Sequence, residues 1–123
     1  MFYCKAQFDG KEIVKNFIQR YKLLPHQELI YGYDEDDTDR LYITYDMDNI
    51  DELDGIPYRS NVWCFDKKTG KRLWVIQPSP WEESTYSGAG IRSDGILRAS
   101  TSESFTFDLD RETGQISNPI WTK

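Results

Sequence analysis

The sequence is poor in residues that form covalent cross-links or catalyse reactions. Its 123 residues include two cysteines, Cys4 and Cys64, and one histidine, His26. Small secreted domains usually carry more cysteines, so we expect two reduced thiols and a cytoplasmic protein. His26 has no nucleophilic Ser or Cys motif near it, which disfavours acid–base and nucleophilic catalysis. We therefore predict that the chain is not an enzyme and has no catalytic residue.

Long apolar segments are also missing. No run of residues approaches the roughly 18 apolar positions that a membrane-spanning helix needs. Residues 1–9 contain no basic region followed by an apolar core, so we expect no secretory signal. These observations agree with a cytoplasmic location and predict no membrane partner.

Basic residues are scarce in one part of the chain. Between Glu28 and Asp54 there are eleven acidic residues and a single base, Arg40, so this segment has a charge of −10. The remainder has fourteen bases and ten acids, a charge of +4, which gives the net charge of −6. This asymmetry disfavours direct nucleic-acid binding by the acidic segment and indicates a basic partner or a cation.

Aromatic side chains, in contrast, are abundant. Eight Tyr, six Phe and four Trp make up 15 % of the chain, and aromatic residues favour strands. The length suffices for a core without disulfides or metal, so we predict one mainly β domain over residues 1–123.

One helix is predicted near the start, over residues 10–24. Asp9 and Glu12 have the spacing of a capping box, and Pro25 ends the segment. The apolar residues of this segment form one amphipathic stripe: Ile13, Val14, Phe17, Ile18 and Tyr21. A helix lying on a membrane surface is the alternative, disfavoured because the stripe is short and lacks Trp.

The remaining residues favour strands arranged as two repeats. The pattern Asp-x-x-Thr-Gly occurs at 66–70 and again at 110–114, 44 residues apart. We assign a first unit to residues 28–77 and a second to residues 80–123. The first contains an acidic insertion from Asp46 to Tyr58, and in the second we expect a polar loop at 84–90 before the strands resume at Ile96.

Apolar patterns predict how these strands are layered. Residues 62–65 and 73–76 are unbroken apolar runs, typical of strands buried on both faces, whereas 105–110 alternates, which is typical of one buried face. Pro119 places the last strand at a sheet edge. We expect two antiparallel sheets packed face to face, with the helix covering the outer face of the first.

The repeat resembles the blade of quinoprotein-type β-propellers. In that family a strand ending in Asp, an Asp-x-x-Thr-Gly turn and a strand ending in Trp recur. Here the matching residues are Asp66, Thr69, Gly70, Leu73 and Trp74, while Ser117 replaces the Trp in the second unit. Two blades cannot close a ring, so the resemblance implies a half-propeller of two blade-like sheets. It implies turn roles for Thr69 and Gly70 and a packing role for Trp74. No cofactor is implied, because cofactor binding in that family uses the centre of a full ring.

The acidic insertion does not match a known calcium loop. Counted from Asp46, an EF-hand pattern fails at Ile50, Asp51 and Pro57, so we predict no metal ligand set. A looser cation site and a simply solvated pair of loops remain as alternatives.

Acidic loops interspersed with Tyr and Met indicate a protein interface, because charge steers association and aromatic residues often anchor it. A small, acidic, aromatic-rich chain is similar in character to immunity proteins of bacterial toxin systems, including contact-dependent growth inhibition. This resemblance implies that the partner is a cognate basic toxin domain, with a nuclease favoured. It also implies that this chain is a monomer when it is free. The expected partner-binding residues are Tyr33, Asp34, Glu35, Asp36, Asp37, Asp39, Tyr45, Asp46, Asp48, Asp51, Glu52 and Asp54.

The alternative hypothesis is a β-module without catalytic activity that binds a small ligand, a glycan or a cation. In this reading Trp81 and Tyr86, within residues 79–90, form an aromatic platform for the ligand.

Overall fold

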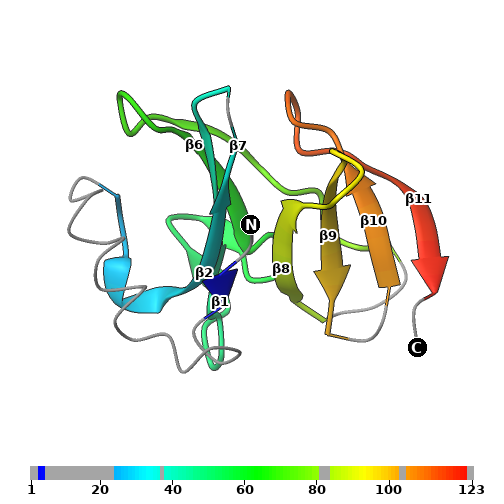
Figure 1. Ribbon diagram of the computed structural model, residues 1–123. Helices are drawn as coiled ribbons and strands as arrows, with labels where there is room; N and C mark the ends of the chain where they lie inside the picture. Colours follow the sequence, from blue (N-terminus) through cyan, green and yellow to red (C-terminus); the bar gives the residue numbers. More distant parts are fainter. Residues whose placement is uncertain (1–2, 5–23, 37, 81–83, 103–104, 122–123) are drawn as a thin grey trace.

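Two antiparallel sheets form most of the molecule, which confirms the mainly β prediction (Figure 1). The computed structural model describes residues 3–4, 24–36, 38–80, 84–102 and 105–121. The first sheet has the order β1-β2-β3-β6-β7 and the second β11-β10-β9-β8. The strands of the first sheet are β1 (Tyr3–Cys4), β2 (Ile30–Glu35), β3 (Arg40–Tyr45), β6 (Val62–Asp66) and β7 (Arg72–Val75). Those of the second are β8 (Tyr86–Ile91), β9 (Leu97–Thr101), β10 (Phe105–Leu109) and β11 (Ile116–Trp121).

Each unit is a meander in which consecutive strands pair. β2, β3, β6 and β7 are neighbours in chain order, and so are β8 to β11. The connection from β3 to β6 contains the acidic insertion, which forms a short hairpin of β4 (Glu52–Leu53) and β5 (Ile56–Pro57). Asp54 and Gly55 form its two-residue turn with φ of 52° and 79°, the conformation that Asp-Gly pairs favour in tight hairpins.

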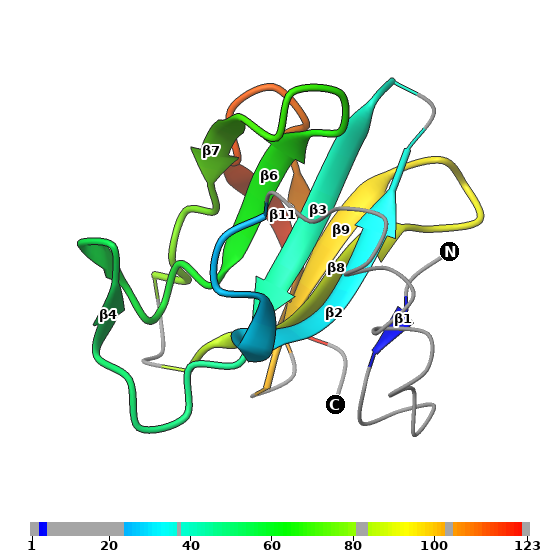
Figure 2. The ribbon, with the colours of Figure 1, turned by 90° about the vertical axis from the view of Figure 1, so that its left-hand side faces the viewer.

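Strands β3 and β6 of the first sheet are buried on both faces, as predicted for residues 62–65. Leu41, Ile43, Trp63 and Phe65 belong to a core on the outer face of this sheet, whereas their neighbours in β3 and β6 turn toward the second sheet. That inter-sheet core contains Tyr42, Val62, Cys64, Trp74, Ile76, Tyr86, Ala89, Leu97, Ala99, Phe107 and Leu109. Figure 2 shows the first sheet in front of the second.

The two Asp-x-x-Thr-Gly turns have the same hydrogen bonds. Asp66 Oδ1 accepts the backbone N–H groups of residues 68 and 69 at 2.8 and 3.1 Å. Asp110 Oδ1 accepts those of residues 112 and 113 at 2.7 and 3.2 Å. Gly70 and Gly114 follow with φ of 74° and 77°, where glycine has no steric cost. The predicted turn roles of Thr69 and Gly70 therefore agree with this geometry, since Thr69 Oγ1 also accepts the Lys71 backbone N–H at 3.2 Å.

Trp74 links the first unit to the second. Its indole Nε1 donates to the carbonyl of Arg111 at 2.8 Å, and its ring lies against Gly114. A Cβ at position 114 would come within 2.5 Å of Trp74 Cε3, so only glycine fits without displacement. The predicted packing role of Trp74 agrees with this contact.

The outer face of β9 and β10 is polar, whereas the edge strand β11 adds the half-exposed side chain of Ile120 beside Thr106. Arg98 pairs with Asp108 at 2.9 Å and with Asp94 at 2.8 Å. Asn118 donates to the second oxygen of Asp108 at 3.0 Å, and hydrogen bonds from Asn118 and Arg98 lower the pKa of that carboxyl. The predicted alternation of residues 105–110 is thus correct, because Phe107 and Leu109 face the inter-sheet core.

The strand predictions need two corrections. Residues 86–91 form β8, not a polar loop, because Gly88, Ala89 and Gly90 are small enough to pack closely against β2 and β3. Leu73 is not buried on both faces, because β7 is an edge strand and leaves this side chain 42 % exposed. The edge position of the strand that contains Pro119 is confirmed, since β11 ends the second sheet.

Apart from Leu24, the predicted helix over residues 10–24 lies outside the described residues. Leu24 itself is buried and irregular. The described part contains one short 3-10 helix, Gln27–Leu29, and within it no helix has the length and apolar character needed to cross a membrane.

Candidate functional site

The β2–β3 hairpin separates the two acidic runs. Its strands pair from Ile30 with Tyr45 to Glu35 with Leu41. The described acids Asp34, Glu35, Asp36 and Asp39 therefore lie at the turn end of the hairpin, while the acidic insertion begins at the other end of β3 (Figure 2). The described residues do not bring both runs onto one surface.

Asp36, near the hairpin turn, forms hydrogen bonds within the protein. It accepts hydrogen bonds from the Thr38 hydroxyl at 2.6 Å, the Tyr42 hydroxyl at 2.5 Å and the backbone N–H groups of Thr38 and Arg40. The Arg111 guanidinium of the second unit lies 3.5 Å away. Burial alone would raise the pKa of Asp36, but these hydrogen bonds outweigh it and lower the pKa below the ordinary aspartate value.

Asp34 also joins the two units. Its side chain is buried, with Oδ2 accepting the Ile91 backbone N–H at 2.7 Å and Oδ1 accepting the Glu35 N–H at 2.9 Å. Withdrawing this carboxylate toward an external partner would leave buried backbone donors unpaired, which costs about 1–3 kcal/mol. Asp34 therefore holds β2 to β8.

The other predicted residues fall into three groups. Tyr33 and Tyr45 are buried, and burial raises the pKa of Tyr45, whose hydroxyl donates to the Pro25 carbonyl at 2.9 Å. Three acids have basic partners: Glu35 with Lys67 at 3.4 Å, Asp39 with Lys68 at 3.1 Å and Asp54 with His26 at 2.8 Å. Asp46, Asp48, Asp51 and Glu52 are exposed and form no ion pair within the described residues. Asp37 lies outside the described residues.

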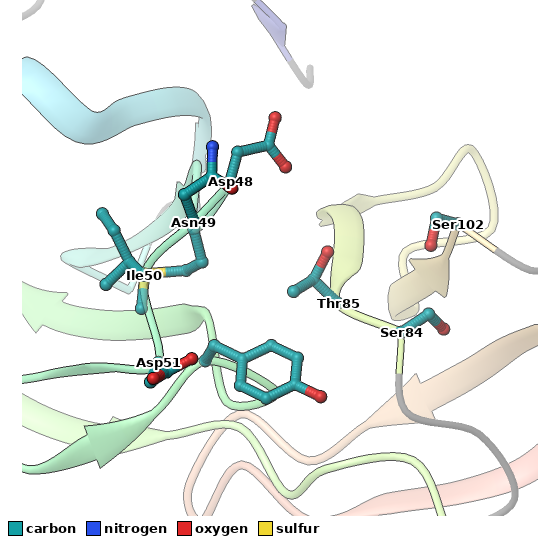
Figure 3. A pocket seen from close by; sticks show the side chains of 9 residues that line it. Asp48, Asn49, Ile50, Asp51, Ser84, Thr85 and Ser102 are labelled. Atoms are coloured by element: carbon teal, nitrogen blue, oxygen red, sulfur yellow. The ribbon is translucent and has the colours of Figure 1, made fainter.

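A pocket of about 330 Å³ opens beside this exposed group. One side is made by the acidic insertion, with Asp48, Asn49, Ile50 and Asp51, and the other by Ser84, Thr85 and Ser102 of the second unit (Figure 3). Met47 and Tyr58 complete the lining. The pocket therefore brings together an acidic wall and a hydroxyl wall from the two units.

One buried amide fixes these two walls relative to each other. Asn61, 2 % exposed, donates from Nδ2 to the carbonyls of Tyr45 and Tyr86, both at 2.9 Å. Its Oδ1 accepts the Tyr86 N–H at 2.8 Å. Tyr45 directly precedes the acidic insertion and Tyr86 directly follows Thr85. Asn61 therefore holds the backbone next to each wall of the pocket.

The sequence indicated only half of this pocket. Asp48 and Asp51 were expected because of their charge, but Ser84, Thr85 and Ser102 carry no motif. Their approach to the insertion depends on β8 and β9 packing behind the first sheet. Recognising residues 86–91 as a strand would have been the available signal.

The described residues include few candidates for catalysis or metal binding. His26 hydrogen-bonds to Asp54, and burial raises the pKa of the Cys64 thiol to about 12, which keeps it protonated at neutral pH. Within the described ranges, no three His, Cys, Asp or Glu residues are grouped to hold a metal. That the chain is not an enzyme and needs no cofactor stays a prediction.

The aromatic platform of the alternative hypothesis is not formed by Tyr86. This residue is 2 % exposed, and its hydroxyl donates to the Gln77 carbonyl at 2.7 Å, so its ring belongs to the inter-sheet core. Trp81 lies outside the described residues.

No protein-family model, curated protein or solved structure matches this chain. The site is therefore interpreted from its own geometry.

Proposed function

We propose that this chain is an inhibitor of the immunity-protein type, which binds a basic toxin domain through the exposed acids of the insertion and the pocket beside them. The observation that supports this proposal is the contrast between the two acidic runs. Asp34 and Asp36 are committed to internal hydrogen bonds, whereas Asp46, Asp48, Asp51 and Glu52 are exposed without an ion pair in the described part.

Electrostatics favours the exposed group as the binding surface. Asp48, Asp51 and Glu52 form no ion pair within the described residues, so they can attract a basic protein without first breaking one. Asp46 also forms none there, but its Oδ1 accepts the Asp48 N–H at 3.1 Å. Several such charges on one surface also accelerate encounter, by about tenfold to a thousandfold at low salt. Binding through Asp34 would instead require the two sheets to lose a hydrogen bond between them.

A nuclease is the favoured toxin activity. The active-site cleft of a nuclease is basic because it binds the phosphate backbone, so a compact group of carboxylates resembles its substrate. The half-propeller interpretation belongs to the same proposal: the two meanders, with identical turns, form the scaffold, and the acidic insertion is the part that the second unit lacks.

Charge reversal tests the proposed surface. If a gene adjacent to this one encodes a toxin domain, that domain is the partner to be used. Asp48→Lys should slow its association by roughly tenfold at low salt, because one attractive charge becomes repulsive. The measurement is stopped-flow association at several salt concentrations, accompanied by protection of bacterial growth on co-expression.

Glu112→Lys is the control, since it makes the same change in net charge on a side chain that is 75 % exposed on the second unit, although it also breaks the ion pair of Glu112 with Arg40 at 3.1 Å. It should change association much less than Asp48→Lys. If the two variants behave alike, or if Asp48→Lys protects growth and associates as the wild type does, the proposed surface is wrong.

The pocket also favours a second candidate function, a small-ligand-binding module. Its volume of about 330 Å³ lies at the lower end of the range for small-molecule sites, about 300–1,000 Å³. A ligand that binds only the folded chain raises its melting temperature. A thermal-shift scan with Ca²⁺ and simple glycans therefore tests this candidate without any protein partner.

A further inference from the structure

We propose that the pocket between the acidic insertion and the second unit seats the side chain of an arginine that the partner inserts. This inference rests on the proposed function and names the chemistry by which the partner is recognised. It is argued from the composition of the two walls, from the apolar part of the lining and from the way in which Asn61 holds the walls.

The two walls require a ligand with donors on more than one side. Asp48 and Asp51 supply carboxylates on one wall, and Thr85 and Ser102 supply hydroxyl groups on the other (Figure 3). A guanidinium presents five N–H donors in a rigid planar fork, whereas an ammonium presents three on a strongly hydrated point charge. A single arginine can therefore donate to both walls at once. Anionic ligands are disfavoured because the same carboxylates repel them.

The apolar lining suits the aliphatic part of an arginine. Met47 is 7 % exposed and Ile50 is half-buried, and both contribute to the pocket beside the carboxylates. Arginine side chains commonly bury their methylene groups on apolar surface while the charged end reaches polar groups. A cation without such a stem, such as a metal ion, would leave this part of the lining unused.

The pocket is held in shape before any ligand arrives. Asn61 bonds the backbone on both sides of the pocket, and the Ser102 N–H donates to the Thr85 carbonyl at 3.2 Å within the hydroxyl wall. In the acidic wall the Tyr58 N–H donates to the Asp51 carbonyl at 2.9 Å. Such preorganisation lowers the entropy that binding must overcome, which is typical of anchor pockets.

A small probe tests the pocket without the partner. N-acetylarginine amide is titrated into the full chain while backbone amide resonances are followed by NMR. The amides of Asp48, Asp51, Thr85 and Ser102 should shift together and saturate, and added salt should weaken the effect. N-acetylcitrulline amide, which has nearly the same shape but no charge, should bind at least tenfold more weakly. An absence of shifts, or equal shifts with citrulline, would overturn the inference.

Two variants test whether the arginine probe binds at the pocket. Their melting temperatures show whether a change in binding comes from a change in folding. Asp51→Asn retains the size of the side chain and should weaken arginine-probe binding at least fivefold, whereas Glu112→Gln should leave it unchanged. Asp51→Asn should keep the melting temperature of the wild type, because this carboxylate is exposed and forms no ion pair within the described residues. Glu112→Gln removes a surface ion pair with Arg40 at 3.1 Å and should lower the melting temperature only slightly, because exposed pairs contribute little to stability. Equal weakening by the two substitutions would show non-specific attraction and refute the assignment.

A last experiment measures the affinity of the chain for its partner. In a double-mutant cycle, one partner Arg→Ala substitution should remove the effect of Asp51→Asn on affinity, because both changes break the same contact. If no partner arginine couples to Asp51 although Asp48→Lys slows association, the arginine inference fails and the proposed function stands. If the probe binds but Asp48→Lys does not affect the partner, the proposed function fails instead.

Discussion

At the scale of single residues, acidic side chains in this protein have two separate roles. Asp34, Asp36 and Asp108 are held by several donors each, and for Asp36 and Asp108 these donors lower the pKa. Asp48 and Asp51 face solvent at the pocket and have no such donors in the described part. Composition cannot distinguish the two groups, because it counts charges without their partners.

Asp36→Asn should destabilise the fold at neutral pH. The folded-state pKa of Asp36 is lower than its unfolded value, so its contribution is fully present above the unfolded pKa and is lost as pH falls through the folded pKa. We expect a loss of about 1–3 kcal/mol at pH 7, shrinking steadily below about pH 4. Urea unfolding of both proteins between pH 7 and pH 2 measures this difference.

Asp48→Asn serves as the control for that experiment. Its carboxylate is exposed and accepts no hydrogen bond from a described residue, so the change should stay within about 0.5 kcal/mol at every pH. A pH-independent loss in Asp36→Asn would show that packing, not the charged network, accounts for its effect.

At the scale of elements, two turn glycines have the same left-handed backbone but different surroundings. Gly114 lies under the Trp74 ring, with Trp74 Cε3 and the Val75 carbonyl at 2.5 and 2.8 Å from where a Cβ would be. Gly95, in the turn between β8 and β9, has φ of 82° and nothing within 4 Å of that position. Comparing substitutions at Gly114 and Gly95 therefore distinguishes the cost of a left-handed backbone from the cost of steric crowding.

Gly114→Ala should therefore cost more than Gly95→Ala. Both place alanine in the left-handed region, at about 1–2 kcal/mol, but only position 114 adds overpacking of about 1–3 kcal/mol. Chemical denaturation of the two variants gives the comparison. Equal losses would contradict the packing assigned to Trp74 and Gly114.

The sequence predicted the elements whose signals are local. The 66–70 and 110–114 turns were recognisable because Asp, Thr and Gly each have a required place in them, and the edge strand at Pro119 because proline lacks a donor. Residues 86–91 were not recognisable, since glycine and alanine are poor strand formers whose value here is close packing against β2 and β3. Half of the pocket was missed for the same reason.

At the scale of the whole molecule, polar and apolar contacts join the two sheets. Asp34 bonds Ile91, Asn61 bonds Tyr86 and Trp74 bonds the carbonyl of Arg111, so polar contacts cross the interface at several points around a shared apolar core. Separating the sheets would expose that core and leave buried donors and acceptors unpaired.

Unfolding should therefore be cooperative across both sheets. In native-state hydrogen exchange, the slowest amides of β3 and β9 should report opening free energies within about 1 kcal/mol of each other. Asn61→Ala should lower both values together by about 1–3 kcal/mol, since it leaves buried backbone groups unpaired. A set of β8–β11 amides that exchanges at a distinctly lower free energy would show that the second sheet opens alone.

The polar outer face of β9 and β10 disfavours the packing of another sheet against them. Stacking another sheet there would bury Arg98 with its two aspartates, and ion pairs that lose water are seldom repaid by their mutual attraction. In repeat proteins a terminal unit with a hydrophilic outer side ends the array. Charge on that side thus disfavours burying these strands against a third sheet, whereas the opposite side of the same strands is apolar and packs against the first sheet.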